Sequence, residues 1–375
     1  MIRRRWVLFV LAALVGWSGV SCSNPAPIAR YSPSATTAAG SPSSSGPISI
    51  CLGAMPASWA AAFAGRTIAI RGVTGFGVQA VDPVSNYAYG TYGNFRVAAI
   101  DLSTGAVTVA AELPSTIAGI ASMSVDDPWL VWVEADSQSD LGLWKIVAWN
   151  RLTQTTRTLA TSQLPDGTDF ANFVTAPVVG SDYAAWLQPV SHSVVELRVY
   201  KFDTNTVSVL DRGMIGSPIL MGRYLAWPKL SSLGGQSVLS LADSSTLASV
   251  RTPPALASPL KVMFATGSSN YLVWTPDGHS WSAQRLDDGA IRTLIVPSDG
   301  RHFAQYPMVA GSDLVWWSGG YTTLVDLQTG NGFDFGGGSA AAAGDLVVVT
   351  GLQNGHETLS SASPSTETSI SSCNR

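Results

Sequence analysis

Histidines and paired carboxylates are the residues of this chain whose types could do chemistry, but their spacing matches no common catalytic motif. No two of the four histidines lie at the short spacing of a zinc motif, and no Gly-x-Ser-x-Gly nucleophile elbow occurs. The acid pairs Asp126-Asp127 and Asp287-Asp288 fall in predicted turns, where Asp bonds to nearby backbone. We therefore expect solvated histidines, turn-capping acids and no catalytic residue. The histidines are His192, His279, His302 and His356.

Cofactor and metal sites are likewise not predicted. The stretch Thr67–Gly77 ends in glycines like those of a dinucleotide loop, but such a loop needs a helix N-terminus directly after it to hold the pyrophosphate. The residues that follow show no helical period, so this stretch is predicted to be a turn. Distant histidines can still converge at the axis of a ring, which leaves a metal site as the alternative.

The N-terminus carries the pattern of an export signal. Arg3-Arg4-Arg5 is followed by an apolar stretch over Trp6–Gly16, then by the small residues Gly19-Val20-Ser21 before Cys22. The apolar stretch is shorter than the roughly 20 residues that span a bilayer. Gly19–Cys22 resembles the lipobox of bacterial lipoproteins, with Gly19 where that motif usually has Leu. The resemblance implies a signal peptide over 1–21 and lipidation of Cys22; ordinary cleavage with a free Cys22 is the alternative.

A tether follows over residues 22–47. It is built from Ser, Pro, Ala, Thr and Gly, with almost no side chain that could enter a core. We expect a disordered leash that holds a folded domain at the extracytoplasmic face of the cell membrane.

Cys51 and Cys373 remain once Cys22 is assigned to the lipid, and they flank the predicted domain. In an oxidising compartment, such a pair predicts a disulfide. The expected geometry places Ile48–Cys51 beside Thr368–Ser372, the latter as the outer strand of the last repeat. Two unpaired cysteines, or a bond between chains, are the alternatives.

The charge balance excludes one class of partner. The formal charge is −4, and because three arginines belong to the predicted signal peptide, the remainder carries −7. An acidic surface repels phosphate backbones, so nucleic acid is not an expected partner.

Internal repeats predict the fold. An apolar segment, a Gly-containing turn and a strand ending in Trp recur with spacings mostly near 42 residues. This is the period of four-stranded propeller blades, and the alternating short strands argue against helical repeats. We predict an all-β propeller of about seven four-stranded blades over 48–373. The clearest repeats are Pro177–Trp186, Pro218–Trp227, Thr266–Trp274 and Pro307–Trp316, and weaker ones surround Tyr89, Trp132 and Val348.

Two segments carry a family resemblance. Asp101-Leu-Ser-Thr-Gly105 and Asp326-Leu-Gln-Thr-Gly330 resemble the strand-to-turn ends of TolB-type and WD40-like propeller repeats. The resemblance covers roughly 78–372 and implies architecture, not activity, because such propellers serve as scaffolds, accessory domains and enzymes.

The repeated tryptophans can be interpreted as a ligand-stacking ring or as core. We predict core, because a large aromatic at one position of every blade fills the wedge between neighbouring sheets. Before the first blade, Ala54–Ala64 has helical composition, with Pro56 near its start and Gly65 after its end, which predicts one short helix.

The sequence thus predicts a membrane-tethered, non-catalytic binding module or scaffold. Its expected partner is a protein, with an envelope glycan as the other possibility, and the membrane is contacted through the lipid. The alternative function is an enzyme acting on cell-envelope carbohydrate, with its site at the propeller axis.

Overall fold

A computed structural model describes most of the chain beyond residue 45. The described residues are 46–93, 96–114, 119–136, 143–164, 166–170, 175–191, 194–230, 235–299, 302–303, 306–318, 321–335, 338–353, 355–367 and 370. Structural statements below refer to these residues, and the predicted signal peptide and tether up to 45 lie outside them.

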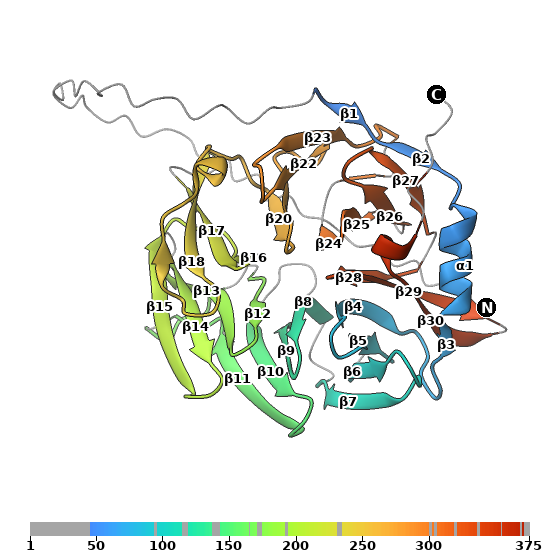
Figure 1. The fold of residues 1–375 in the computed structure, drawn as a ribbon. Coiled ribbons are helices and arrows are strands. Elements are labelled where there is room, and N and C mark those ends of the chain that lie inside the picture. The colour runs from blue at the N-terminus through green and yellow to red at the C-terminus, as the bar shows by residue number, and fades with distance from the viewer. Residues whose placement is uncertain are drawn as a thin grey trace. The chain divides into compact units, whose positions relative to one another are not determined.

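The described strands form seven sheets around an axis (Figure 1), which we call blades 1 to 7. Blade 1 has β4 (Gly77–Asp82), β5 (Tyr87–Tyr92), β6 (Arg96–Asp101) and β7 (Val107–Glu112). Blade 2 has β8 (Gly119–Asp126), β9 (Trp129–Ala135), β10 (Trp144–Asn150) and β11 (Thr155–Thr161). Blade 3 has β12 (Val178–Gly180), β13 (Tyr183–Ser191), β14 (Val194–Lys201) and β15 (Thr206–Gly213). Blade 4 has β16 (Ile219–Met221), β17 (Tyr224–Leu230), β18 (Ser237–Asp243) and β19 (Ser249–Val250).

The remaining blades also use strands from the start of the chain. Blade 5 has β20 (Phe264–Gly267), β21 (Tyr271–Thr275), β22 (Ser280–Arg285) and β23 (Ile291–Ile295), with β1 (Ile48–Ser49) added outside in parallel. Blade 6 has β24 (Met308–Ala310), β25 (Asp313–Ser318), β26 (Tyr321–Asp326) and β27 (Asn331–Asp334), with β2 (Cys51–Gly53) added in the same way. Blade 7 has β28 (Ala340–Ala343), β29 (Leu346–Gln353), β30 (His356–Ala362) and β3 (Thr67–Ala69). The predicted seven-bladed β-propeller is confirmed.

The second strand of each blade lies inside its sheet, between the first and the third strand. In β9 every residue is buried, so both faces of the strand contact protein, and its sequence is apolar except for Glu134. Five tryptophans at one position of this strand are at most 6% exposed, and each packs in a cluster with residues of the preceding blade. The wedge interpretation is confirmed for Trp132, Trp186, Trp227, Trp274 and Trp316.

Two of the weaker repeat anchors are displaced by one residue. Strand register places Gly90 of blade 1, not Tyr89, at the tryptophan position, where a Cβ would lie 2.1 Å from the Gly77 carbonyl oxygen and 2.9 Å from the ring of Phe76. In blade 7 the equivalent residue is Val349, not Val348. Because successive strand residues point to opposite faces, Tyr89 instead packs toward blade 2.

The ring is closed by a strand from the N-terminal side. β3 pairs antiparallel with β30, with Ile68 opposite Leu359, and so supplies the outer strand of blade 7. The prediction that Thr368–Ser372 forms this strand is wrong, and Ile48–Cys51 pairs with β23 and β27 instead. Closure between the first and last parts of the chain removes two bare sheet edges.

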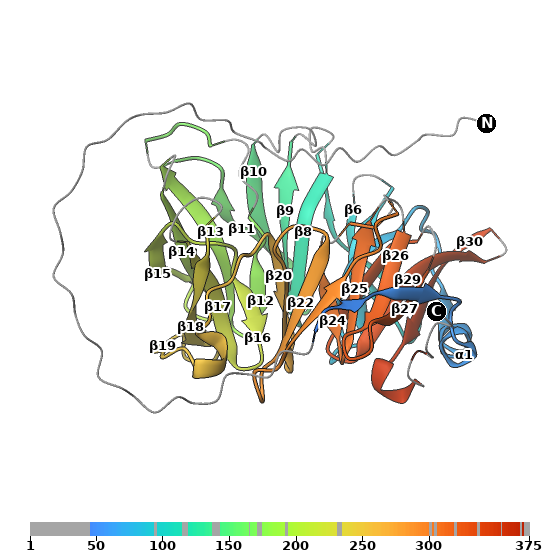
Figure 2. The same ribbon diagram turned by 90° about the horizontal axis from the view of Figure 1, so that it is seen from above.

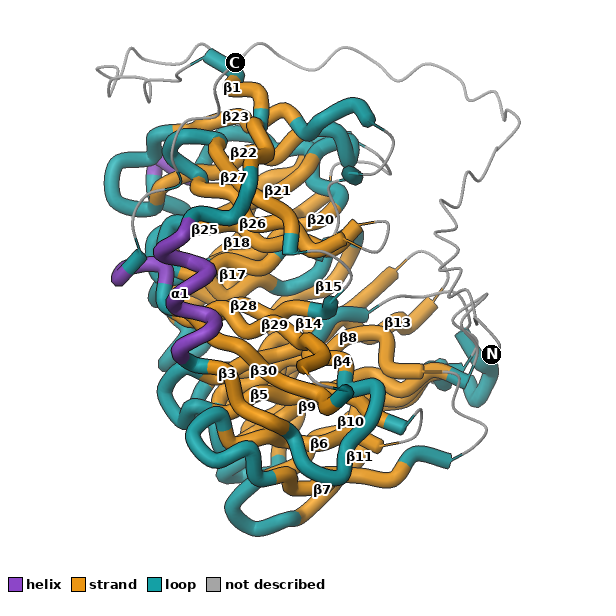
Figure 3. The backbone as a smooth tube through the Cα atoms, turned by 90° about the vertical axis from the view of Figure 1, so that its right-hand side faces the viewer, coloured by secondary structure: helices purple, strands orange, loops and turns teal. Residues whose placement is uncertain are grey.

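The segment before β3 forms a strap over the outer edges of blades 5 to 7. After β1 and β2 comes the helix α1 (Ala57–Gly65), which lies across the outside of the ring (Figure 3). Trp59 and Phe63 are buried against Phe333 and Phe335. The predicted helix is confirmed, and it starts after Pro56, whose extended backbone cannot belong to the helix.

The ring has two different ends, seen with the sheets side by side in Figure 2. The turn face carries the short hairpins that join the first to the second strand of each blade and the third to the fourth strand of blades 1 to 6. The loop face carries the second-to-third turns and the connections between blades. The predicted hairpin chemistry is confirmed, as in Asp101, whose Oδ1 accepts bonds from the Ser103 and Thr104 amides, and in Gly105, which has φ +72°. No helix among the described residues is long and apolar enough to cross a bilayer.

Candidate functional site

The three cysteines differ in how far the structure describes them. Cys22 and Cys373 lie outside the described residues. Cys51 lies in β2 and is disulfide-bonded to a partner outside them. Its register partner Asn331 donates a hydrogen bond from Nδ2 to the carbonyl of Ile370 at 3.2 Å, which places Ile370 near β2. The pairing of Cys51 with Cys373 remains a prediction that this geometry favours.

His302 is the histidine that the sequence interpretation treated wrongly. His279 and His356 are exposed as expected, and His192 lies outside the described residues. The His302 side chain is only 4% exposed, because the connection between blades 5 and 6 turns it into the protein. Singly placed loop histidines are usually solvated, and this one is held by two carboxylates instead.

The contacts of His302 join a loop to a sheet. Nδ1 lies 2.8 Å from Oδ2 of Asp299, and Nε2 lies 3.3 Å from both carboxylate oxygens of Asp334 at the end of β27. A neutral imidazole donates through one nitrogen, whereas an imidazolium donates through both. Thr323 donates to Asp334 Oδ1 at 2.7 Å and fixes that carboxylate. The imidazole therefore ties the connection after β23 to β27, the fourth strand of blade 6.

Accessible groups lie beside this buried centre and on the same connection between blades 5 and 6. The side chains of Asp299 and Asp334 are 41% and 30% exposed. Tyr321, whose ring centroid lies 6.4 Å from that of His302, is partly exposed. Tyr306 is half-exposed, has φ +49° and lies 5.6 Å from the ring of Phe264 at the start of an innermost strand. We call Asp299, His302, Tyr306, Tyr321 and Asp334 the loop-face site.

The loop-face site can accept hydrogen bonds and stack. Carboxylates accept from hydroxyls, amides and cations, and aromatic rings cover apolar faces of a ligand. The backbone of Tyr306 is in a region that non-glycine residues rarely occupy, which is common at binding sites. Within the described ranges, no group of three or more His, Cys, Asp or Glu is placed to hold a metal ion. The only feature of the sequence that could have indicated this site is the short spacing of Asp299 and His302, because Asp334 comes from another strand.

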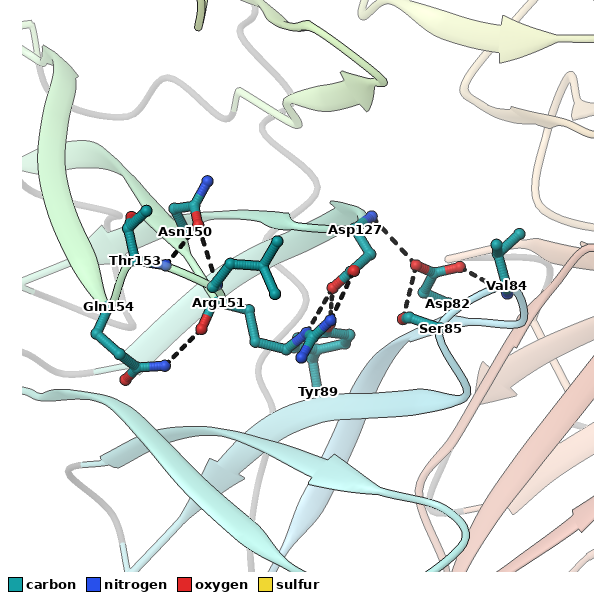
Figure 4. A network of polar contacts seen from close by, with 10 residues as sticks. Asp82, Val84, Ser85, Tyr89, Asp127, Asn150, Arg151, Thr153 and Gln154 are labelled. Atoms are coloured by element: carbon teal, nitrogen blue, oxygen red, sulfur yellow. Dashed lines mark hydrogen bonds and ion pairs between the residues drawn. The ribbon is translucent and has the colours of Figure 1, made fainter.

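A second polar cluster links blades 1 and 2 on the turn face (Figure 4). Arg151 makes a bidentate ion pair with Asp127 at 2.6 and 2.7 Å, and its guanidinium stacks 4.3 Å over the Tyr87 ring. The Tyr89 hydroxyl donates to Asp127, and the Asp127 amide donates to Asp82.

This cluster changes one sequence interpretation. The hydrogen bond to Asp127 raises the pKa of Arg151, and burial raises the pKa of Tyr89, so both keep their protons. Asp127 is thus an inter-blade clamp, and the turn-capping prediction is wrong for Asp126-Asp127, because no described backbone amide donates to either carboxylate. Asp287-Asp288 do cap their turn, since their carboxylates accept the amides of Asp288 and Ala290.

These features define a seven-bladed β-propeller with a partly exposed polar and aromatic site on its loop face. No family model matches the chain, and no curated protein matches it. Among solved structures, an oligogalacturonate lyase in complex with manganese is similar, with 9% identity and a TM-score of 0.45 over 76% of each chain. TolB from Acinetobacter baumannii is similar with 13% identity and a TM-score of 0.37, covering 78% of this chain and 66% of TolB. At these identities the likeness is one of fold alone.

Proposed function

We propose that this protein is a β-propeller binding module or scaffold, held at the extracytoplasmic face of a bacterial cell membrane by a lipid on Cys22. The loop-face site carries the proposal: half-exposed Tyr306 and partly exposed Asp299 and Asp334 stand on a rigid ring, and the buried imidazole of His302 holds the two carboxylates. Rigid scaffolds that present loops of different lengths are typical binding surfaces. A protein is the expected partner, since aromatic rings beside charged groups are common at protein interfaces.

In-cell photo-crosslinking tests this function. A benzophenone amino acid replaces Tyr306 in the tethered protein, and the control places it at Val209, which is also half-exposed but lies on the outer edge of blade 3. We expect discrete crosslinked species at position 306 and none at position 209. Identical products at both positions, or none at either, would contradict a loop-face binding site.

The rival function is an enzyme acting on envelope carbohydrate. The arrangement that favours it is the pair of carboxylates flanking His302, because glycan-cleaving sites use two acids and aromatic rings bind sugar faces. Purified protein is incubated with isolated envelope glycan and new reducing ends are counted. Release that is lost in Asp334→Asn and retained in the surface control Asp166→Asn would establish the enzyme and overturn the non-catalytic proposal.

A further inference from the structure

The turn face concentrates the negative charge of the protein. Its hairpins and the strand residues that border them are described in full and contain twelve aspartates and four cations, and the guanidiniums of Arg157 and Arg292 also bond to these hairpins. The excess of six carboxylates over cations accounts for most of the net charge of −7 beyond the predicted signal peptide. The aspartates are Asp82, Asp101, Asp126, Asp127, Asp182, Asp203, Asp243, Asp287, Asp288, Asp313, Asp326 and Asp345, and the cations are Arg151, Lys201, Arg223 and Arg285.

Half of these carboxylates lie in the first-to-second hairpins, which are nearest the axis. Adjacent hairpins there are in direct contact, as where the Gly311 amide donates to the Gly344 carbonyl at 2.6 Å. These acids interact electrostatically. Burial is the main cause that raises the pKa of Asp126, and the negative charges of Asp82 and Asp127 raise this pKa further. Only Asp127 of this inner group has an ion-pair partner among the described residues, because the guanidinium of Arg151 is committed to it.

Several acids have a structural role, which by itself would explain their presence. Asp101, Asp243 and Asp326 cap the third-to-fourth turns by accepting backbone amides. Asn150 caps the equivalent turn of blade 2 without a charge. Capping therefore requires an acceptor but not a carboxylate, and the excess charge needs a further explanation.

One buried polar group in this face has no partner within the described residues. The Tyr183 hydroxyl is fully buried, makes no hydrogen bond to a described group, and is coupled electrostatically to Asp182, Asp126 and Asp243. Leaving such a group unpaired costs about 1–3 kcal/mol, so its retention points to a ligand that completes it. Asp313 is 5% exposed with carboxylate oxygens that are not fully buried, and no described group donates to them; the charges of Asp326 and Asp345 act on this carboxylate.

Asp313 also differs from the residues that occupy the same position in the other blades. Strand register equates it with an aromatic residue in each of blades 1 to 5 and with Leu346 in blade 7. A carboxylate where the fold otherwise packs an apolar side chain is not required by the architecture. The aromatic residues are Tyr87, Trp129, Tyr183, Tyr224 and Tyr271.

We propose that the turn face is the docking surface for a basic segment, rich in Lys and Arg, of a partner protein. Such a segment supplies ammonium and guanidinium donors for acceptor-only carboxylates and backbone carbonyls for the Tyr183 hydroxyl. Uncompensated charge of one sign speeds association with the opposite sign. This proposal rests on the proposed function in one respect, that the chain is a binding module. It concerns the turn face, whereas the proposed function concerns the loop-face site.

The test measures binding of a fluorescein-labelled ten-residue Arg/Ser peptide to the purified domain in 0.15 M salt. Asp126→Asn/Asp182→Asn removes two inner carboxylates whose side chains make no hydrogen bond in the described residues, so folding should be retained. Glu112→Gln/Asp169→Asn removes two carboxylates from the loop face as the control. We expect the turn-face variant to bind at least fivefold more weakly and the control to bind within twofold of the parent.

Equal weakening in both variants would mean attraction by net charge alone and would overturn the proposal, as would no binding by the parent protein. A thermal unfolding transition for each variant verifies that it is folded. If the peptide does not bind the turn face, the crosslinking experiment at Tyr306 can still succeed. The two experiments therefore distinguish a wrong docking surface from a wrong binding function.

Discussion

Single side chains in this protein depart from the repeat where the surroundings differ between blades. Asp313 occupies the position that aromatic residues fill in blades 1 to 5, and it faces Asp326 and Asp345 without a donor among the described residues. His302 is buried because two carboxylates surround it. Neither environment follows from local sequence, since the neighbouring groups come from other strands.

The buried carboxyl of Asp313 predicts a pH-dependent stability. Burial, followed by the charges of Asp326 and Asp345, raises its pKa from 3.8 to about 7. The folded state therefore favours the protonated form, and stability should fall as pH rises from about 4 to about 7 and then level off. Asp313→Asn should remove this loss and stabilise the fold at pH 8 by up to ~4 kcal/mol, measured by urea unfolding at pH 5 and pH 8.

Asp203→Asn is the control, because it removes an exposed aspartate from the same face. The variant at Asp313 should change the difference between the two pH values, and the control should not. A destabilised Asp313→Asn at pH 8 would show that the carboxylate has a favourable partner and would contradict this account.

The outer strands show how six of the seven blade edges are protected. β7, β11 and β15 each contain a register shift against their neighbour, a bulge that disfavours pairing with another chain. In blades 5 and 6 the edges are covered by β1 and β2, and in blade 7 the outer position is filled by β3. The strap thus stabilises the part of the ring where the chain ends meet.

The predicted Cys51–Cys373 bond belongs to this strap. It would close a loop of more than 300 residues, for which chain entropy gives at most about 5 kcal/mol. With Cys22 replaced by Ser, protein folded in an oxidising compartment should show no reactive thiol under denaturing, non-reducing conditions. Cys51→Ser/Cys373→Ser should unfold at a lower temperature yet keep the closed ring, because β3 still pairs with β30. Two reactive thiols in the parent would contradict the bond.

For the whole molecule, the lipid on Cys22 predicts where the protein is found in the cell. Radiolabelled fatty acid should enter the wild-type protein and not Cys22→Ser, and the variant should move from the membrane fraction to the soluble fraction. Cys51→Ser is the control, since it should keep the label. Equal release of wild type and Cys22→Ser would contradict the anchor.

The sequence by itself determined the architecture. Repeats near 42 residues, a Trp at the end of a short strand and Asp-x-x-Thr-Gly turns each reflect interactions within one blade or with the next, so they recur along the chain. The helix after Pro56 is equally local, since its ends depend on proline and glycine.

Only the tertiary structure decided how the ring closes and which polar groups meet. β3 has three residues, and its pairing with β30 joins segments about 290 residues apart, for which a three-residue pattern carries no register information. Likewise His302 meets Asp334, Asp127 meets Arg151, and Asp313 meets Asp345 because blades are packed around an axis. Such contacts depend on spatial proximity between blades, which no spacing along the chain encodes.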